Sequence, residues 1–453
     1  MKRFLFTAVA VQLIFTGFLL SQKADPSYYF QKGETFYDER QYDSALGFLF
    51  EAIRLDSSYA EAFNKIGNIY LRTSRHDSAM YYYNKSIEAD PGFAEAYNNR
   101  GIIYYLGRQY DSAVKEFQKS INADAEFTNA YNNLGLVYSE LGRYDKAIEE
   151  FSKSLKIEPG NIKTLSKRST THLNKHEFQK ALDDINRAIK IDTTSLDLYL
   201  NRATIYSITG QIDSAIADYT YVLEYRPGNI DLLMLRSMAY ASAENYEKAI
   251  EGFDRILKID PKISDVYVNR GLAYQEMGEF KSAIDDYGRA LELNPDSYEA
   301  IYNRGLAYNL VENHAEAVKD FEKALQLRDD DPLVYMNLGI AYSQTERAEE
   351  ALEKYSKALE LDSTYADAYV NRGFLYYLES EYEKAYKDAS KAIEYNPDHV
   401  LAYYLRGSAL RYMNKIEESI SNLEKFMEIS RGIPGMSKYR SFAKNHLLIL
   451  RKL

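Results

Sequence analysis

Small and aromatic residues recur along this chain at a fixed spacing of 34 residues. The segment AYNNRGIIYYLGRQYDSAVKEFQKSI begins at Ala96, and the similar segment AYNNLGLVYSELGRYDKAIEEFSKSL begins at Ala130. Steps of 34 residues from Gly101 reach a small residue each time, at Gly33, Gly67, Gly135, Ser169, Ala203, Ser237, Gly271, Gly305, Gly339, Gly373 and Gly407. A period of this length, kept without an insertion, indicates a stacked repeat array.

The array covers residues 26–433 as twelve repeats: 26–59, 60–93, 94–127, 128–161, 162–195, 196–229, 230–263, 264–297, 298–331, 332–365, 366–399 and 400–433. We number positions 1 to 34 within each repeat, so that the small residue is position 8. Position 4 is aromatic in nine repeats, position 11 is tyrosine in nine, and position 20 is alanine in eleven. Because positions 4, 8, 11 and 20, 24, 27 have helical spacing, each repeat should hold two amphipathic helices, A and B.

Polar and special residues predict where these helices begin and touch. Aspartates at position 18 suit the start of helix B, as at Asp43, Asp77, Asp111, Asp145 and Asp213. Proline at position 32 is expected at the start of the next helix A, as at Pro91, Pro159, Pro227, Pro261, Pro295 and Pro397. Glycine inside a helix costs about 1 kcal/mol relative to alanine. Its repeated use at position 8 therefore predicts the closest approach of helices A and B there and at the position-20 alanine.

Composition and the N-terminus narrow the functional classes. The chain has 56 basic and 67 acidic residues, a net charge of −11, which argues against a general nucleic-acid binder. It has no cysteine, so disulfides and thiolate metal sites are excluded. Met1-Lys2-Arg3 precedes an apolar run over 4–20, so residues 1–25 are predicted to be a signal peptide or a membrane anchor. A buried first helix of the array is the remaining interpretation.

The predicted leader also gives an orientation. Basic residues stay on the cytoplasmic side, so the leader would engage the membrane and place the repeats outside the cytoplasm. That location would be the periplasm if the source is a Gram-negative bacterium.

This pattern resembles the tetratricopeptide repeat family over residues 26–433. The aromatic at position 4, glycine at 8, tyrosine at 11, alanine at 20, aromatic at 24 and proline at 32 are present in most repeats, and tyrosine replaces the usual tryptophan. Repeats 162–195 and 230–263 fit poorly and are expected to be irregular repeats. The resemblance implies an all-α solenoid, a right-handed superhelix whose A helices line a concave groove that binds peptides or partner proteins.

Position 6 supplies the candidate binding residues, because it lies about 200° around helix A from the packed face. Asparagine, a poor helix former, stands there in seven repeats, and its amide could hydrogen-bond the backbone of an extended peptide. This ladder, similar to that of long superhelical tetratricopeptide arrays, comprises Asn99, Asn133, Asn201, Asn269, Asn303, Asn337 and Asn371. Alternatively, these amides only solvate the face or bond the adjacent repeat. The run from Asn269 to Asn371 is the longest and predicts the best groove, whereas Lys65, Lys167 and Leu235 interrupt the ladder elsewhere.

Charged residues accompany the ladder on helix A. Position 2 is acidic at Glu61, Glu95, Asp197, Asp231, Asp265, Glu299 and Asp367. This stripe would favour partners with basic segments, although acids at helix N-termini are common for dipole reasons alone. Arginine at position 7 coincides with an acid at position 23 in six repeats, which predicts structural ion pairs between helices, with an acid of the same or the preceding repeat.

Catalytic, metal and cofactor motifs are not evident in the sequence. His172 and His176 are spaced i, i+4, but His172 takes the packed tyrosine position and no third ligand is evident. The acidic run 329–331 lacks the spacing of a calcium loop. We therefore expect no enzyme, no cofactor and no metal, and a protein-interaction scaffold that binds extended peptides or proteins. The alternative is an assembly subunit of a cell-envelope complex that uses the convex ridge or the C-terminal helix.

Residues 434–453 leave the repeat. Tyr439, Phe442, Ala443, His446, Leu447, Leu450 and Leu453 fall at helical spacing, which predicts a helix that caps the array. From Arg431 onward there are six lysines or arginines and no acid, so contact with anionic lipid or an acidic partner is the alternative role.

Overall fold

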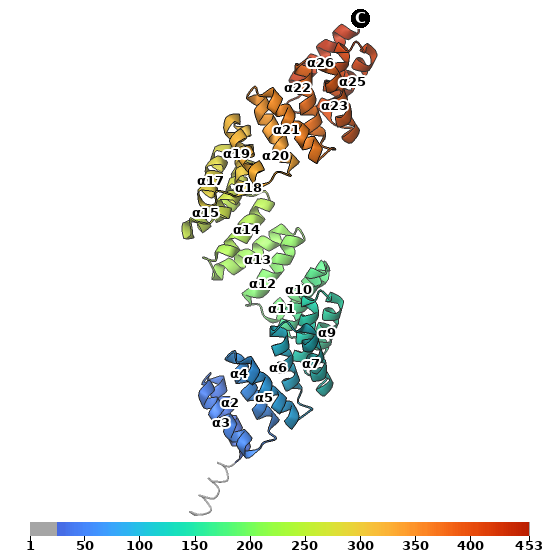
Figure 1. Ribbon diagram of the computed structural model, residues 1–453. Coiled ribbons are helices and arrows are strands. Elements are labelled where there is room, and N and C mark those ends of the chain that lie inside the picture. The colour runs from blue at the N-terminus through green and yellow to red at the C-terminus, as the bar shows by residue number, and fades with distance from the viewer. Residues whose placement is uncertain (1–24, 453) are drawn as a thin grey trace, which may run out of the picture. The chain divides into compact units, whose positions relative to one another are not determined.

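The computed structural model describes residues 25–452, and the regular structure in that range is twenty-five α-helices (Figure 1). The all-α fold class and the pairs of amphipathic helices are confirmed. The predicted leader lies almost entirely outside the described residues. Within the part of the chain that the structure describes, no helix has the length and apolar character needed to span a bilayer.

The described residues form two compact bodies, one ending at Val222 and the other beginning at Leu223, and this boundary falls within one helix. In the N-terminal body the A and B helices alternate from Pro26 onward. Its helices are α2 (Pro26–Asp38), α3 (Tyr42–Leu55), α4 (Ala60–Arg72), α5 (His76–Ala89), α6 (Ala94–Leu106), α7 (Tyr110–Ala123), α8 (Thr128–Glu140), α9 (Tyr144–Ile157), α10 (Ile162–Asn174), α11 (Phe178–Ile191), α12 (Leu196–Ile208) and most of α13 (Ile212–Tyr225).

The C-terminal body continues the same alternation and ends with one additional helix. Its helices are α14 (Ile230–Ser242), α15 (Tyr246–Ile259), α16 (Ser264–Glu276), α17 (Phe280–Leu293), α18 (Tyr298–Leu310), α19 (His314–Leu327), α20 (Pro332–Gln344), α21 (Ala348–Leu361), α22 (Ala366–Leu378), α23 (Tyr382–Tyr395), α24 (Val400–Tyr412), α25 (Ile416–Ile429) and α26 (Ser437–Leu450). Each helix A begins at the first residue of a 34-residue repeat.

The packing of helix A on helix B explains the glycine at position 8. A Cβ atom on Gly101 would lie 2.6 Å from the Cε1 atom of Phe117, the position-24 ring of the same repeat. The same contact would form between Gly339 and Tyr355 at 2.6 Å. The predicted close approach is therefore present, and the group that requires it is the buried ring at position 24. The alanine at position 20 is fully buried beside it.

The prediction that the position-32 proline stands at the start of helix A is wrong. Pro91 lies in the turn between α5 and α6, and α6 begins three residues later, at Ala94. The Asp90 carboxylate accepts a hydrogen bond from the Gly92 N–H at 2.8 Å, and the Phe93 N–H donates to the Asp90 carbonyl at 3.1 Å. Proline presets the backbone angle of such a turn, so its role is in the turn between repeats.

Position 15 ends every helix A in the left-handed conformation. Its φ lies between 55° and 77° in all twelve repeats, although glycine stands there only at Gly142, Gly210 and Gly278. In the first repeat the Gln41 N–H donates to the Phe36 carbonyl at 2.8 Å, and the Arg40 N–H donates to the Tyr37 carbonyl at 2.9 Å. This pair of bonds satisfies the last carbonyls of the helix and reverses the chain toward helix B.

Both repeats that depart from the pattern form complete helix pairs. In repeat 162–195 the Ser169 hydroxyl occupies the glycine position and donates to the Ala181 carbonyl at 2.7 Å. In repeat 230–263 the Ser237 hydroxyl donates to the Leu233 carbonyl at 2.7 Å. Gly252 makes room for this serine, because a Cβ there would lie 2.0 Å from the Ser237 Oγ atom. They are irregular repeats, as expected.

Candidate functional site

The position-6 asparagines bond mainly to the preceding repeat. In five of the seven, the side-chain Nδ2 contacts the position-5 side chain 35 residues earlier. The pairs are Asn99 with Asn64 (3.0 Å), Asn133 with Asn98 (2.8 Å), Asn201 with Ser166 (3.3 Å), Asn337 with Tyr302 (3.3 Å) and Asn371 with the Met336 sulfur (3.8 Å). The ladder therefore links neighbouring A helices, which is one of the alternatives that the sequence left open.

Exposure of these amides varies along the ladder. Asn99 is only 8% exposed, because the side chains of Asn64, Asn68 and Asn98 surround it with hydrogen bonds. Asn201 is exposed, and the other five are half-buried. Position 6 is thus not uniformly directed to solvent, since neighbouring A helices cover part of it.

Among the described residues, Asn269 and Asn303 make no bond to the preceding repeat. Asn337, by contrast, bonds both Tyr302 and the Leu333 carbonyl of its own helix. The Nδ2 groups of Asn269 and Asn303 donate to carbonyls of their own helix, Asn269 to Asp265 at 2.7 Å and Asn303 to Glu299 at 2.8 Å. Within residues 25–452 neither amide oxygen of these two accepts a hydrogen bond. Both oxygens therefore remain available to a donor from outside the chain.

The same two asparagines line a cavity between α16 and α18. Its volume is about 410 Å³, and its lining is Asp265, Val268, Asn269, Leu272, Ser297, Glu299 and Asn303. The carboxylates of Asp265 and Glu299 are exposed. The cavity combines two amides with two acids and an apolar wall.

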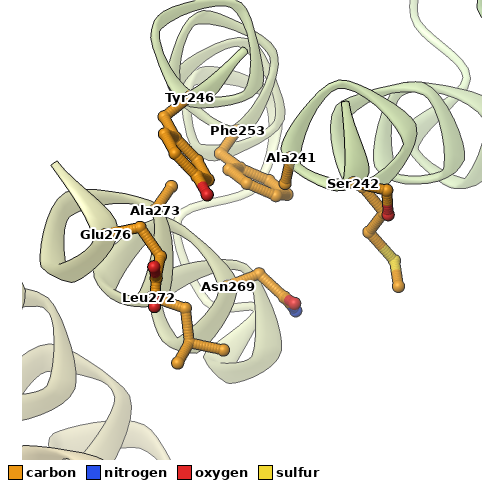
Figure 2. A pocket seen from close by; sticks show the side chains of 9 residues that line it. Ala241, Ser242, Tyr246, Phe253, Asn269, Leu272, Ala273 and Glu276 are labelled. Atoms are coloured by element: carbon orange, nitrogen blue, oxygen red, sulfur yellow. The ribbon is translucent and has the colours of Figure 1, made fainter. Parts of the chain in front are cut away.

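A second cavity adjoins the first and shares Asn269 and Leu272 with it. Its volume is about 370 Å³, and α14, α15 and α16 supply its lining. Figure 2 shows Tyr246 and Phe253 on one side, with Asn269, Leu272, Ala273 and Glu276 on the facing helix. Two exposed apolar side chains of α14 lie on this part of the surface: Met238 lines the cavity, and Leu235 stands at position 6 in place of asparagine.

We call the surface over α14, α16 and α18 that holds both cavities the candidate groove. The run from Asn269 to Asn371, predicted from the sequence to give the best groove, overlaps this surface at Asn269 and Asn303. The sequence prediction assigned no role to α14 in the groove. It treated Leu235 only as an interruption and did not identify Met238 at all. The available signal was the exchange of an amide for an apolar residue at one position of the ladder, directly before that run.

Arginines at position 7 form the predicted structural ion pairs. Six pairs join position 7 with the acid at position 23 of the same repeat: Arg100–Glu116, Arg168–Asp184, Arg202–Asp218, Arg270–Asp286, Arg304–Asp320 and Arg372–Asp388. Arg168 shows the geometry, with Nε and Nη2 each 2.7 Å from the two oxygens of Asp184. Its Nη1 also donates to the Ser152 hydroxyl at 2.8 Å. The arginine therefore connects its own helices A and B with helix B of the preceding repeat.

Burial opposes ionisation of Asp286, the acid that pairs with Arg270. Burial raises the pKa of the Asp286 carboxyl, and the hydrogen bond from Arg270 lowers it without cancelling that rise. The same pair raises the pKa of the Arg270 guanidinium. Asp286 is thus held in its charged form by Arg270, an arrangement suited to fixing helix register.

His172 and His176 do not form a two-histidine site. The His172 Nδ1 atom lies 2.7 Å from the Glu177 carboxylate, and His176 lies beyond the end of α10 with its ring against Phe178. Hydrogen bonds from Lys175, His172 and Lys180 lower the pKa of Glu177 to about 2. Across residues 25–452, no three histidine or acidic side chains gather as a metal site would require.

Models of the tetratricopeptide repeat match most of the array. The matched residues are 30–92, 82–115, 128–161, 208–268, 264–297, 297–364, 366–399 and 400–432. The chain belongs to the tetratricopeptide repeat family. The irregular repeat 230–263 lies inside a matched segment. As a member of this family, the protein is in general terms a protein-interaction scaffold. The family is generally non-catalytic.

Several solved structures are similar to this chain. MamA is 28% identical over 36% of this chain and 96% of its own length, with a TM-score of 0.35. A tetratricopeptide repeat protein from Parabacteroides merdae is 22% identical over 55% of this chain and 98% of its own, with a TM-score of 0.43. YrrB, a repeat protein with an unusual peptide-binding site, is 24% identical over 45% of this chain and 100% of its own, with a TM-score of 0.37. No curated protein sequence matches the chain.

Proposed function

We propose that the protein is a non-catalytic scaffold that binds an extended peptide segment, from a peptide or a partner protein, in the candidate groove. The observation that carries this proposal is the pair of adjoining cavities that share Asn269 and Leu272. The amide oxygens of Asn269 and Asn303 are one repeat apart, and within residues 25–452 neither of them accepts a hydrogen bond. Such amides can accept from the backbone N–H groups of an extended peptide without reading its side chains.

The lining residues define the preferred peptide. An apolar side chain fits against Met238, Leu272 and Tyr246, where it covers surface that is otherwise exposed to water. A lysine or arginine placed beside it would meet Asp265 or Glu299 in the cavity between α16 and α18. The ligand class is therefore an extended segment in which an apolar residue is followed or preceded closely by a basic one.

A displayed library of random peptides, presented to the full chain, tests this specificity. The selected peptides should combine an apolar with a basic residue. Their affinity should fall about tenfold or more for the combined variant Met238→Ala, Asn269→Ala and Asn303→Ala, which removes apolar contact and two hydrogen-bond acceptors. Dissociation constants measured by calorimetry for one selected peptide give the comparison.

Asn201→Ala is the matched control, because Asn201 is an exposed position-6 asparagine in the N-terminal body. Its affinity for the same peptide should equal that of the unchanged protein. Equal binding by the unchanged protein and the combined variant, with both equally folded, would show that the groove is idle. Function would then rest with the other surfaces, as expected of an assembly subunit.

We also propose that the repeats reside outside the cytoplasm, exported or anchored through residues 1–25. The basic start and the apolar run 4–20 support this location. Protease added to spheroplasts should digest the repeats of the full chain while a cytoplasmic marker protein stays intact. Protection of the repeats until the membrane is dissolved would place them inside and rule the proposal out.

A further inference from the structure

The last helix, α26, has two apolar faces. On its inner face Ala443, Leu447 and Leu450 are buried and belong to one cluster with Leu423 and Phe426 of α25. This face covers the apolar side that the last repeat would otherwise expose, which is the role of a capping helix.

The outer face of α26 is not the polar surface that a cap requires. Phe442 and Ile449, seven residues apart and so on one side of the helix, are each 47% exposed, and Leu448 is 54% exposed. Large apolar side chains that gather on an exposed surface mark a site of interaction. Phe442 shares the helical spacing of the packed residues, but its exposure shows that it belongs to the outer face.

Basic residues surround these apolar side chains. Lys438, Lys444 and Lys452 are exposed on α26 and just beyond it, and no acidic residue follows Arg431 in the chain. The nearby acids of α25 already have basic partners: Glu424 bonds Arg451 at 2.5 Å, and Glu428 bonds Lys425 at 3.3 Å. The outer face is therefore positive, whereas the whole chain carries −11.

We propose that the outer face of α26 binds an anionic lipid surface. Phe442, Leu448 and Ile449 would enter the boundary between headgroups and acyl chains, while the lysines extend their ammonium groups to lipid phosphates. The combination favours lipid over an acidic protein. The ammonium groups are carried on flexible lysine side chains that border the apolar residues. A membrane that yields around each side chain satisfies both kinds of group at once. This site is separate from the candidate groove and does not depend on it.

The absence of tryptophan from the sequence permits a local test in the full chain. Phe442→Trp places a single fluorescent reporter on the outer face, and Tyr81→Trp places the control at an exposed aromatic position on α5. With vesicles of phosphatidylglycerol and phosphatidylcholine, emission from position 442 should shift to shorter wavelength and be quenched by brominated acyl chains. Emission from position 81 should do neither, even if residues 1–25 attach the protein to the vesicle.

Charge neutralisation provides the second arm. Lys438→Gln, Lys444→Gln and Lys452→Gln, combined in the Phe442→Trp background, should raise the vesicle concentration for half-maximal shift on the order of a hundredfold. Far-UV circular dichroism checks that all variants stay folded. An unchanged emission at position 442 with anionic vesicles, or an equal shift with pure phosphatidylcholine, would overturn the proposal. A shift that needs no lipid and grows with protein concentration would overturn it in favour of self-association through α26.

Discussion

Replacing Arg270 with methionine is expected to lower the free energy of unfolding by about 3 kcal/mol. The Nη2 atom of Arg270 lies 2.6 Å from Asp286, whose side chain is only 6% exposed, and Nη1 also bonds Asp254. Methionine keeps most of the arginine's apolar volume but leaves the buried carboxylate without its counter-charge. Such an isolated charge costs far more than an exposed pair contributes.

Urea unfolding monitored by circular dichroism provides the measurement, and Arg289→Met provides the control. Arg289 bonds Glu292 at 2.6 Å, but both side chains are 65% exposed, so its loss should change stability by no more than about 0.5 kcal/mol. Adding Asp286→Leu to Arg270→Met should recover much of the lost stability, because the pair is then replaced by apolar groups. Equal losses for Arg270→Met and Arg289→Met would contradict the account.

The pH dependence of the Arg270→Met deficit separates charge from packing. Arg270 lowers the pKa of Asp286 against the rise caused by burial, so without Arg270 that pKa should rise further. A carboxyl with a raised folded-state pKa destabilises the fold when ionised, and this cost disappears as the pH falls below that pKa. The deficit relative to the unchanged protein should therefore be full at neutral pH and shrink toward acid pH. A deficit that stays constant would point to lost packing.

The helix pairs could be predicted because the sequence states the same pattern twelve times. One repeat such as 162–195, with Leu165, Ser169 and His172 at its signature positions, would not identify itself. Its phase follows from Ala181 and from its neighbours. Redundancy between repeats therefore replaces the information that an irregular repeat lacks.

Chain reversal between helices A and B could not be predicted from residue type. Nine of the twelve left-handed residues at position 15 are not glycine, among them Arg40, Glu244 and Asn414. The conformation is imposed by the hydrogen bonds that close helix A and by the docking of helix B. Both arise from packing that one residue's preference does not reveal.

The candidate site was predictable in part for a similar reason. A helical projection of one repeat shows that position 6 faces away from helix B, and the helix pairs agree with that. The projection does not include the preceding helix A, whose position-5 side chain meets the amide in five repeats. For Asn303 that position is Val268, which offers no acceptor, and the amide donates to its own helix. Asn337 donates both to Tyr302 and to its own helix.

Gly271→Ala is expected to lower the free energy of unfolding by about 1–2 kcal/mol, although alanine is the better helix former. The added Cβ would lie 2.7 Å from the Cε1 atom of Tyr287, a fully buried ring whose hydroxyl contacts Gln275 at 3.3 Å. The ring cannot move without disturbing the contacts between α16 and α17. Overpacking of this kind outweighs the gain of about 1 kcal/mol in helix propensity.

Repeat 196–229 limits the size of this effect. It carries Ala203 opposite Tyr219, and both are buried, so a helix pair can adapt to one methyl group. Gly288→Ala is the matched control, because Gly288 follows Tyr287 directly in α17 and a Cβ there would meet no atom within 4 Å. That variant should be more stable than the unchanged protein by about 0.5–1 kcal/mol. Opposite signs for two glycine-to-alanine changes in one helix pair would show that position 8 selects glycine for the approach of a ring. If both variants gain stability, glycine at this position has no packing role.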